Sequence, residues 1–135
     1  MAAIHAECFE HSWSQESFCT LLGSPGVFGL LTCRAHGQIG SFVLVRVAAD
    51  EAEILTLATL PAERRSGSAS GLVRTAIEQA KKRGAVRCFL EVAETNQPAL
   101  SLYHKLDFEQ VALRPHYYES RTHAGVAAVV MRREL

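Results

Sequence analysis

The sequence predicts one α/β domain built on a mixed β-sheet, with helices covering both of its faces. Apolar, β-branched segments come first as neighbouring strands and later alternate with two amphipathic segments, the order typical of a mixed sheet. The 135 residues, 48% hydrophobic and 21% charged, suit one hydrophobic core and argue against disorder. We therefore expect residues 1–135 to form a single domain without a linker or repeat.

The first half of the chain is expected to hold two short helices and then three strands, at residues 2–8, 14–22, 27–34, 39–47 and 53–60. Ser14 is a good N-cap for the second helix. The first two strands are joined by residues 35–38, a hairpin turn that contains Gly37. Pro61 ends the third strand because it cannot donate to a sheet ladder.

The second half is expected to hold a helix, a strand, a helix and two strands, at residues 68–83, 86–92, 97–106, 108–113 and 125–132. Apolar residues repeat at helical spacing in the first of these helices, at Leu72, Val73, Ala76, Ile77 and Ala80. Gly84 follows as a plausible C-cap.

The loop before that helix is rich in small residues, from Ser66 to Gly71. Such a loop leaves backbone amides uncrowded at a helix start, where the positive end of the helix dipole attracts anions. Neither a Walker loop nor a dinucleotide fingerprint fits the residues. The loop is therefore predicted to cradle a phosphate or pyrophosphate of another kind.

The same loop contains Arg64-Arg65-Ser66-Gly67-Ser68-Ala69. It resembles the (Arg/Gln)-x-x-Gly-x-(Gly/Ala) pattern of the GNAT superfamily of N-acetyltransferases. Other segments agree in order and spacing, namely Ile4-His5, Trp13-Ser14, Leu90-Glu91-Val92, Asn96, Leu102-Tyr103 and Arg114-Pro115-His116-Tyr117-Tyr118. Together they are similar to the bacterial ribosomal-protein alanine N-acetyltransferases, the RimI-type branch, over nearly the whole chain.

The resemblance implies acetyl-CoA as co-substrate and assigns it a set of binding residues. They are Leu57, Ala58, Thr59, Arg64, Arg65, Ser66, Gly67, Ser68, Ala69, Ser70 and Asn96. The strand residues would pair with the pantetheine arm through their backbone, and the loop amides would take the pyrophosphate. An asparagine just before a helix is also a common N-cap, so Asn96 could serve either purpose or both.

The resemblance implies Glu91 as general base and Tyr103 as general acid. Amide formation from a thioester needs a group that takes the amine proton and one that protonates the leaving thiolate. Glu91 stands at the end of an apolar strand, and a phenol suits the acid role because its pKa lies close to that of a thiol. An exposed strand-end glutamate and a plain core tyrosine are the structural alternatives.

The resemblance also implies an acceptor site that includes Trp13, Arg114, Tyr117 and Tyr118, for the N-terminal amine of a protein. Two departures weaken the assignment to one target, because Ser12 replaces the usual proline and Ala127 an acidic residue. A lysine side chain or small-molecule amine as acceptor, and a non-catalytic acyl-CoA-binding module, remain as alternatives. Family members usually open with a strand, so a first strand is expected to be missing here.

Charge and composition narrow the partners. With 14 basic and 14 acidic residues, neither nucleic acid nor a membrane is expected as a partner. Residues 1–135 contain neither a secretory signal nor an apolar run long enough to cross a membrane, so a cytoplasmic protein is expected. The cysteines and histidines are scattered, which predicts no metal site, and Cys33 and Cys88 are expected in the core. No feature predicts an oligomeric state.

Overall fold

The computed structural model describes residues 1–33, 37–120 and 123–135, with the backbone alone for residues 116–120 and 123–124. Its helices are α1 (Ala2–Cys8), α2 (Gln15–Leu22), α3 (Ser68–Lys82) and α4 (Gln97–His104), with a 3₁₀ turn at Pro61–Glu63. Its strands are β1 (Val27–Cys33), β2 (Ile39–Ala48), β3 (Glu51–Thr59), β4 (Arg87–Ala93), β5 (Glu109–Ser120) and β6 (His123–Glu134). No described helix is long and apolar enough to cross a membrane.

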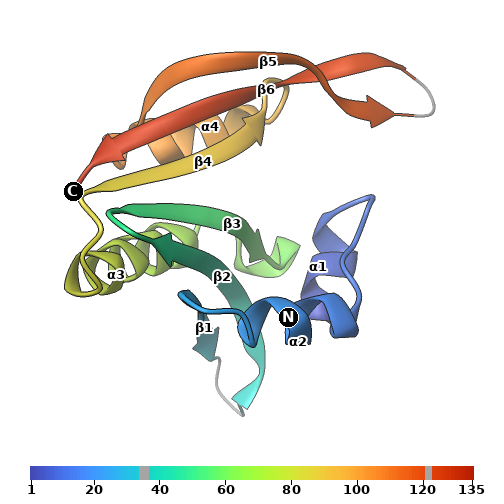
Figure 1. The fold of residues 1–135 in the computed structure, drawn as a ribbon. Coiled ribbons are helices and arrows are strands. Elements are labelled where there is room, and N and C mark those ends of the chain that lie inside the picture. Colours follow the sequence, from blue (N-terminus) through green and yellow to red (C-terminus); the bar gives the residue numbers. More distant parts are fainter. Residues whose placement is uncertain (34–36, 121–122) are drawn as a thin grey trace.

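The six strands form one sheet in the order β1-β2-β3-β4-β6-β5 (Figure 1). Only β3 and β4 run parallel, since α3 connects them as a crossover, and the other neighbours are antiparallel. The predicted mixed sheet is confirmed.

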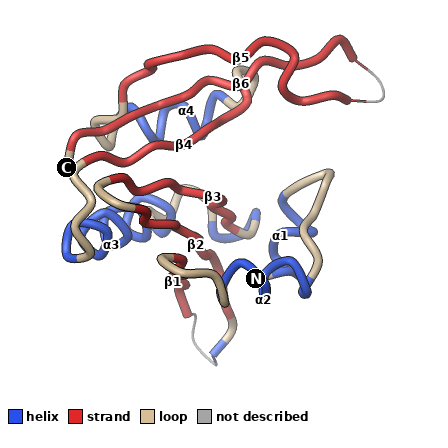
Figure 2. The backbone as a smooth tube through the Cα atoms, in the orientation of Figure 1, coloured by secondary structure: helices blue, strands red, loops and turns tan. Residues whose placement is uncertain are grey.

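Two groups of buried side chains lie on opposite faces of this sheet. On β2, Val43 and Val45 pack with the residues of α3 and α4, whereas Phe42 and Leu44 pack with those of α1 and α2. Since neighbouring strand residues point to opposite faces, the two helix pairs cover different faces of the sheet, as predicted. Figure 2 shows α1 and α2 beside the β1–β3 part of the sheet, with α4 beside β4.

Local capping explains where the helices begin. The Ser14 Oγ accepts the backbone N–H of Ser17 at 3.1 Å, and the Asn96 Oδ1 accepts that of Ala99 at 3.2 Å. Both predicted N-caps are therefore confirmed. Gly84, just beyond the C-cap of α3, has a φ of +96°, the left-handed conformation in which helices commonly end.

The last two strands are longer than the sequence predicts, at 12 residues each instead of 108–113 and 125–132. The pairing register shifts between Arg114 and Tyr118, and Pro115, which has no backbone N–H to donate, lies in this irregular stretch. The irregularity lets β5 continue past the proline. The predicted turn at 35–38 lies partly outside the described residues.

One core prediction is wrong. Cys88 is 1% exposed, as expected for a core residue, but Cys33 is exposed. Strand β1 pairs only with β2 within the described sheet, and Cys33 is its last residue. An apolar stretch of sequence does not distinguish an edge strand from a central one, so the error has a topological cause.

Candidate active site

Strands β3 and β4 separate partway along their length. They pair only from Glu51 with Arg87 to Ile54 with Leu90. Beyond that point β3 continues to Thr59 and β4 to Ala93 without pairing with each other, although β3 stays paired with β2 and β4 with β6. Figure 1 shows the two strands side by side near the C-terminus and diverging toward their other ends. We call this opening the β3–β4 split.

A bulge in β3 lies at the start of the split. Leu44 pairs with Thr56 and Val45 with Ile54, which leaves Leu55 as an extra residue on β3. A bulge bends its strand and increases the local twist. Because Leu55 directly follows the last residue of β3 that pairs with β4, the bulge explains why the two strands part here. Neither glycine nor proline marks the position, so sequence reasoning missed it.

The arm of β3 beyond the bulge carries the predicted backbone contacts, Leu57 to Thr59. These residues pair with β2 on one side and have no strand on the β4 side. The Oγ1 atoms of Thr56 and Thr59 are buried without a hydrogen-bond partner among the described residues. Exposed edge groups and unpartnered hydroxyls fit a polar, extended ligand in the split.

The loop between β3 and α3 offers open space at the helix start. Gly67 is the N-cap of α3, with a φ of +85° and no side chain to cap the helix. A Cβ placed on Gly67 would meet no atom within 4 Å. Ser66 Oγ donates to the Glu63 carbonyl at 2.7 Å, and Arg64 Nε to the Thr59 carbonyl at 3.3 Å. These contacts tie the predicted pyrophosphate loop to the end of β3.

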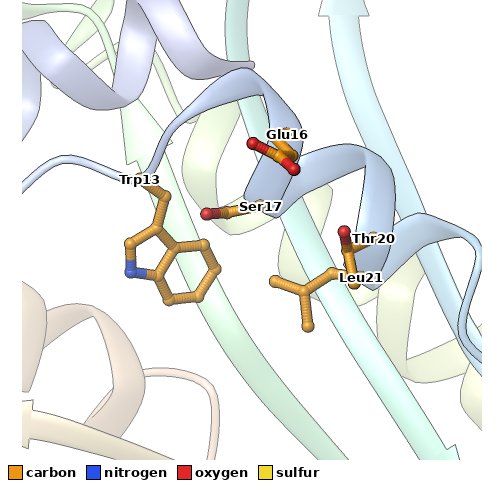
Figure 3. Close-up of a pocket in the computed structure, with 5 residues that line it drawn as sticks. All are labelled: Trp13, Glu16, Ser17, Thr20 and Leu21. Atoms are coloured by element: carbon orange, nitrogen blue, oxygen red, sulfur yellow. The ribbon is translucent and has the colours of Figure 1, made fainter.

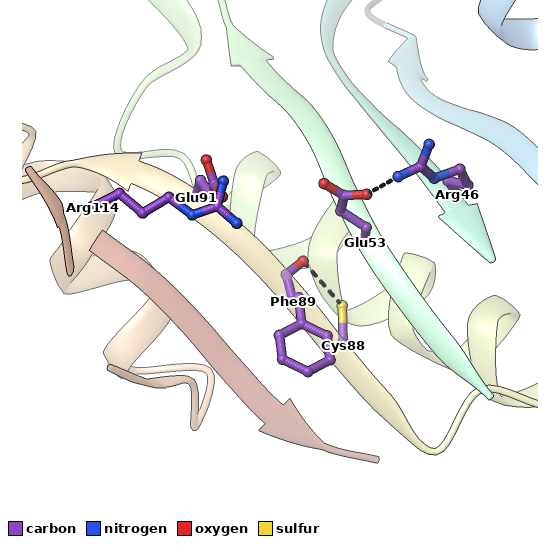
Figure 4. Close-up of polar contacts among 6 residues, drawn as sticks. All are labelled: Arg46, Glu53, Cys88, Phe89, Glu91 and Arg114. Atoms are coloured by element: carbon purple, nitrogen blue, oxygen red, sulfur yellow. Dashed lines mark hydrogen bonds and ion pairs between the residues drawn. The ribbon is translucent and has the colours of Figure 1, made fainter. Parts of the chain in front are cut away.

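Glu91 is the first residue of β4 past its pairing with β3. Its Oε1 lies 3.0 Å from Nη1 of Arg114, and its side chain is 23% exposed. Both residues line a cavity of about 250 Å³ together with Phe89 and the Arg46–Glu53 ion pair. Figure 4 shows the two ion pairs on either side of Phe89. The predicted base is thus partly sheltered and opens into a cavity.

Tyr103 lies on the other face of the sheet. It is 6% exposed, belongs to the core group that includes Leu90 and Val92, and meets Phe108 edge-on at 5.7 Å. Burial raises the pKa of its phenol well above the ordinary value near 10, so the group keeps its proton at neutral pH. Because Glu91 faces away from this core, the two residues approach β4 from opposite faces.

Most of the other predicted site residues do not lie beside Glu91 in the described part of the structure. Trp13 lines a separate open cavity of about 490 Å³ on α2, where Figure 3 shows it at one end and Leu21 at the other. Asn96 uses its Oδ1 to cap α4. Tyr117 and Tyr118 lie on β5, and their side chains are outside the described part. Of the four predicted acceptor residues, Arg114 is the one whose described side chain contacts Glu91.

Neither metal binding nor thiol chemistry gains support. Among the described residues, no group of three or more His, Cys, Asp or Glu side chains could hold a metal ion. Burial raises the pKa of the Cys88 thiol to about 12, so it stays a protonated core thiol.

Two sequence relatives carry the same enzyme name. The chain is 31% identical to the [ribosomal protein bS18]-alanine N-acetyltransferase of Escherichia coli K12, over 96% of this chain and 87% of that protein. It is 34% identical to the protein of the same name from Haemophilus influenzae, over 85% of this chain and 79% of that protein.

Solved structures agree in fold. The crystal structure of the ribosomal-protein alanine N-acetyltransferase from Escherichia coli has a TM-score of 0.89 and 25% identity, over 98% of this chain and 84% of that one. The crystal structure of Arabidopsis thaliana NAA60 in complex with acetyl-CoA has a TM-score of 0.86 and 16% identity, over 99% of this chain and 90% of that one. The profile of the acetyltransferase (GNAT) family matches residues 1–108. The chain therefore belongs to the GNAT family of acetyltransferases.

Proposed function

We propose that this chain transfers the acetyl group of acetyl-CoA to the N-terminal amine of a protein, with a ribosomal protein that begins with alanine as the first candidate. The observation that carries the proposal is the position of Glu91, a partly sheltered carboxylate at the opening of the β3–β4 split. The names of the two relatives, as alanine N-acetyltransferases of a ribosomal protein, support this acceptor. Such an acceptor would be met in the cytoplasm.

The split and the adjoining loop would hold the co-substrate. Acetyl-CoA supplies an acetyl group activated as a thioester. The free edge at Leu57, Ala58 and Thr59 offers backbone groups to an extended arm, as an added strand would use them. The amides from Arg65 to Ser70, at the uncapped start of α3, suit a pyrophosphate because the helix dipole favours an anion there. The free donor group of Asn96 could contact the same arm.

Glu91 would take the proton of the attacking amine. A protonated amine has no lone pair to offer, and a carboxylate within reach removes the proton as the new bond forms. The open face on which Glu91 lies gives an acceptor a route to the split. Since the amine attacks the thioester directly, both substrates must be present together.

Tyr103 would return a proton to the leaving sulfur. Its phenol stays protonated because burial raises its pKa, and its hydroxyl donates to no other described residue. The split passes through the sheet, so one ligand in it could be reached by Glu91 from one face and by Tyr103 from the other. The raised pKa makes Tyr103 a weaker acid than a free phenol, which limits this role to a strongly basic thiolate.

Trp13, Tyr117 and Tyr118 are proposed to shape a peptide groove, and Arg114 borders the cavity of Glu91. A lysine side chain or a small amine would need the same co-substrate site and the same base. The choice among these acceptors has to come from experiment.

A panel of acceptors tests the function directly. Purified protein is incubated with acetyl-CoA and peptides that begin with alanine, the same peptides blocked at the N-terminus but containing lysine, and free small amines. Mass spectrometry then locates the acetyl group. We expect acetylation of the free α-amine; modification of lysine or of small amines alone would favour the second acceptor class. Tight coenzyme A binding without any product would indicate a non-catalytic module.

A further inference from the structure

The side chain of Arg114 crosses a strand to reach Glu91. Strand β6 lies between β4 and β5, with Val130 paired to Glu91 and Ala128 paired to Arg114. Ala128 is fully buried and small, so it leaves room for the long side chain to pass. The guanidinium thereby spans β6 and places Nη1 3.0 Å from Oε1 of Glu91.

The ion pair joins Nη1 of Arg114 to Oε1 of Glu91. A carboxylate has two oxygens with several acceptor sites, so the oxygen held by the cation leaves the other able to accept a proton from an incoming amine. The side chain of Glu91 is 23% exposed and that of Arg114 is 58% exposed, so the arginine is the more solvent-accessible partner of the pair.

We propose that Arg114 is a positioning residue for the catalytic base: it fixes the Glu91 carboxylate at the β3–β4 split rather than binding the acceptor. The proposal rests on the proposed function, in which Glu91 takes the amine proton. A base held by a cation on one oxygen keeps the other in a constant place, and small displacements of a reacting group slow a reaction considerably.

The same sheet face provides a matched comparison. Arg46 and Glu53 form an ion pair between directly opposed positions on β2 and β3. They line the same cavity as Glu91 and Arg114, and Arg46 is 52% exposed, close to the value for Arg114. Their strands remain paired at this point, so this ion pair does not border the split. It controls for the loss of a partly exposed cation.

The test is a double-mutant cycle on the full chain. Turnover and KM for an alanine peptide are measured for the wild type, Arg114→Gln, Glu91→Gln and the double variant, with Arg46→Gln as control. We expect Arg114→Gln to lower kcat by about tenfold with little change in either KM. In the Glu91→Gln background, Arg114→Gln should lower kcat by less than about twofold. Arg46→Gln should stay within about twofold of wild type.

Each outcome bears on a different claim. If Arg114→Gln raises the KM for the peptide, or if its loss in kcat multiplies fully with that of Glu91→Gln, Arg114 binds the acceptor and the positioning role is overturned. If Arg46→Gln slows turnover as much as Arg114→Gln does, the effect is a general loss of positive charge and the positioning role is overturned. A wild-type protein that acetylates no acceptor would refute the proposed function itself. Circular dichroism of each variant checks folding, which the loss of a partly exposed ion pair should not disturb.

Discussion

Glu91 differs from the other carboxylates that line the cavity because the pairing of β4 with β3 ends just before it. Glu53, two strand positions earlier on the neighbouring β3, also faces the cavity and is also paired to an arginine. Its strand is still paired with β4 through Phe89. Of the described carboxylates that line this cavity, Glu91 alone lies beyond the last pairing of β3 with β4, which makes Glu53 its natural control.

Glu91→Gln should lower turnover by roughly 10²–10⁴-fold and leave affinity for coenzyme A nearly unchanged, because only proton transfer is removed. The loss should shrink at high pH, where more of the acceptor amine is already neutral. Initial rates measured from about pH 6 to about pH 10 check the size of the loss in turnover and its decrease at high pH. Glu53→Gln should retain most of the activity, and a loss for Glu91→Gln that does not vary with pH would assign Glu91 a structural role.

Tyr103→Phe separates a chemical role for the hydroxyl from packing of the ring. The hydroxyl makes no hydrogen bond to a described residue, so stability should change by no more than about 1 kcal/mol. If the phenol protonates the thiolate, turnover should fall at least about tenfold. Thermal unfolding and steady-state kinetics on the same preparation measure the two effects.

Tyr103→Ala provides the contrast. It removes a buried ring and should cost roughly 3–5 kcal/mol of unfolding free energy. Wild-type turnover in a stable Tyr103→Phe protein would show that only the ring is needed, and catalysis would then depend on Glu91 without a tyrosine acid.

Among the secondary-structure elements, α3 offers two glycines that can be compared directly. Gly67 lies before the helix and Gly84 after it, with φ values of +85° and +96°, and a Cβ on either would meet no atom within 4 Å. Valine is strained at both positions because of the positive φ. Only at Gly67 would the new side chain also occupy the proposed path of the pyrophosphate.

Gly67→Val should therefore weaken coenzyme A binding strongly, whereas Gly84→Val should lower stability similarly but leave binding unchanged. Isothermal calorimetry with coenzyme A and thermal unfolding of both variants measure the comparison. Equal affinities in the two folded variants would contradict the proposed pyrophosphate site.

For the molecule as a whole, His5 links stability to pH. Its ring is 3% exposed, stacks on Phe9 at 4.2 Å and Trp13 at 5.1 Å, and its Nδ1 accepts the Trp13 backbone N–H. Burial lowers the pKa of His5 below its usual 6.5. The unfolded chain then binds the proton more readily than the folded one, so protonation favours unfolding.

The contribution of His5 to stability should be fully present above pH 6.5, the unfolded value, and should be lost as the pH falls toward the lowered folded pKa. Urea unfolding between about pH 5 and 7.5 measures it. His5→Phe should flatten this dependence, and His104→Gln, a change at an exposed helix end, should not. An unchanged slope in His5→Phe would show that other groups carry the pH effect.

Patterns local in the chain were enough to predict much of this protein. The period of apolar residues predicted α3, and single capping residues such as Ser14 and Asn96 predicted where helices begin, because these interactions span only a few residues. Short motifs carried the family assignment for the same reason. They also placed Glu91 near the end of the strand that carries it, β4.

Tertiary structure alone decided how these local pieces meet. The bulge at Leu55, the split that follows it and the exposure of Cys33 depend on which strands are neighbours, and strand order is not encoded in any short stretch of sequence. The contact between Arg114 and Glu91 joins residues 23 positions apart through an intervening strand. A motif gives a residue its neighbours in the chain, whereas the partner of its side chain is set by the sheet.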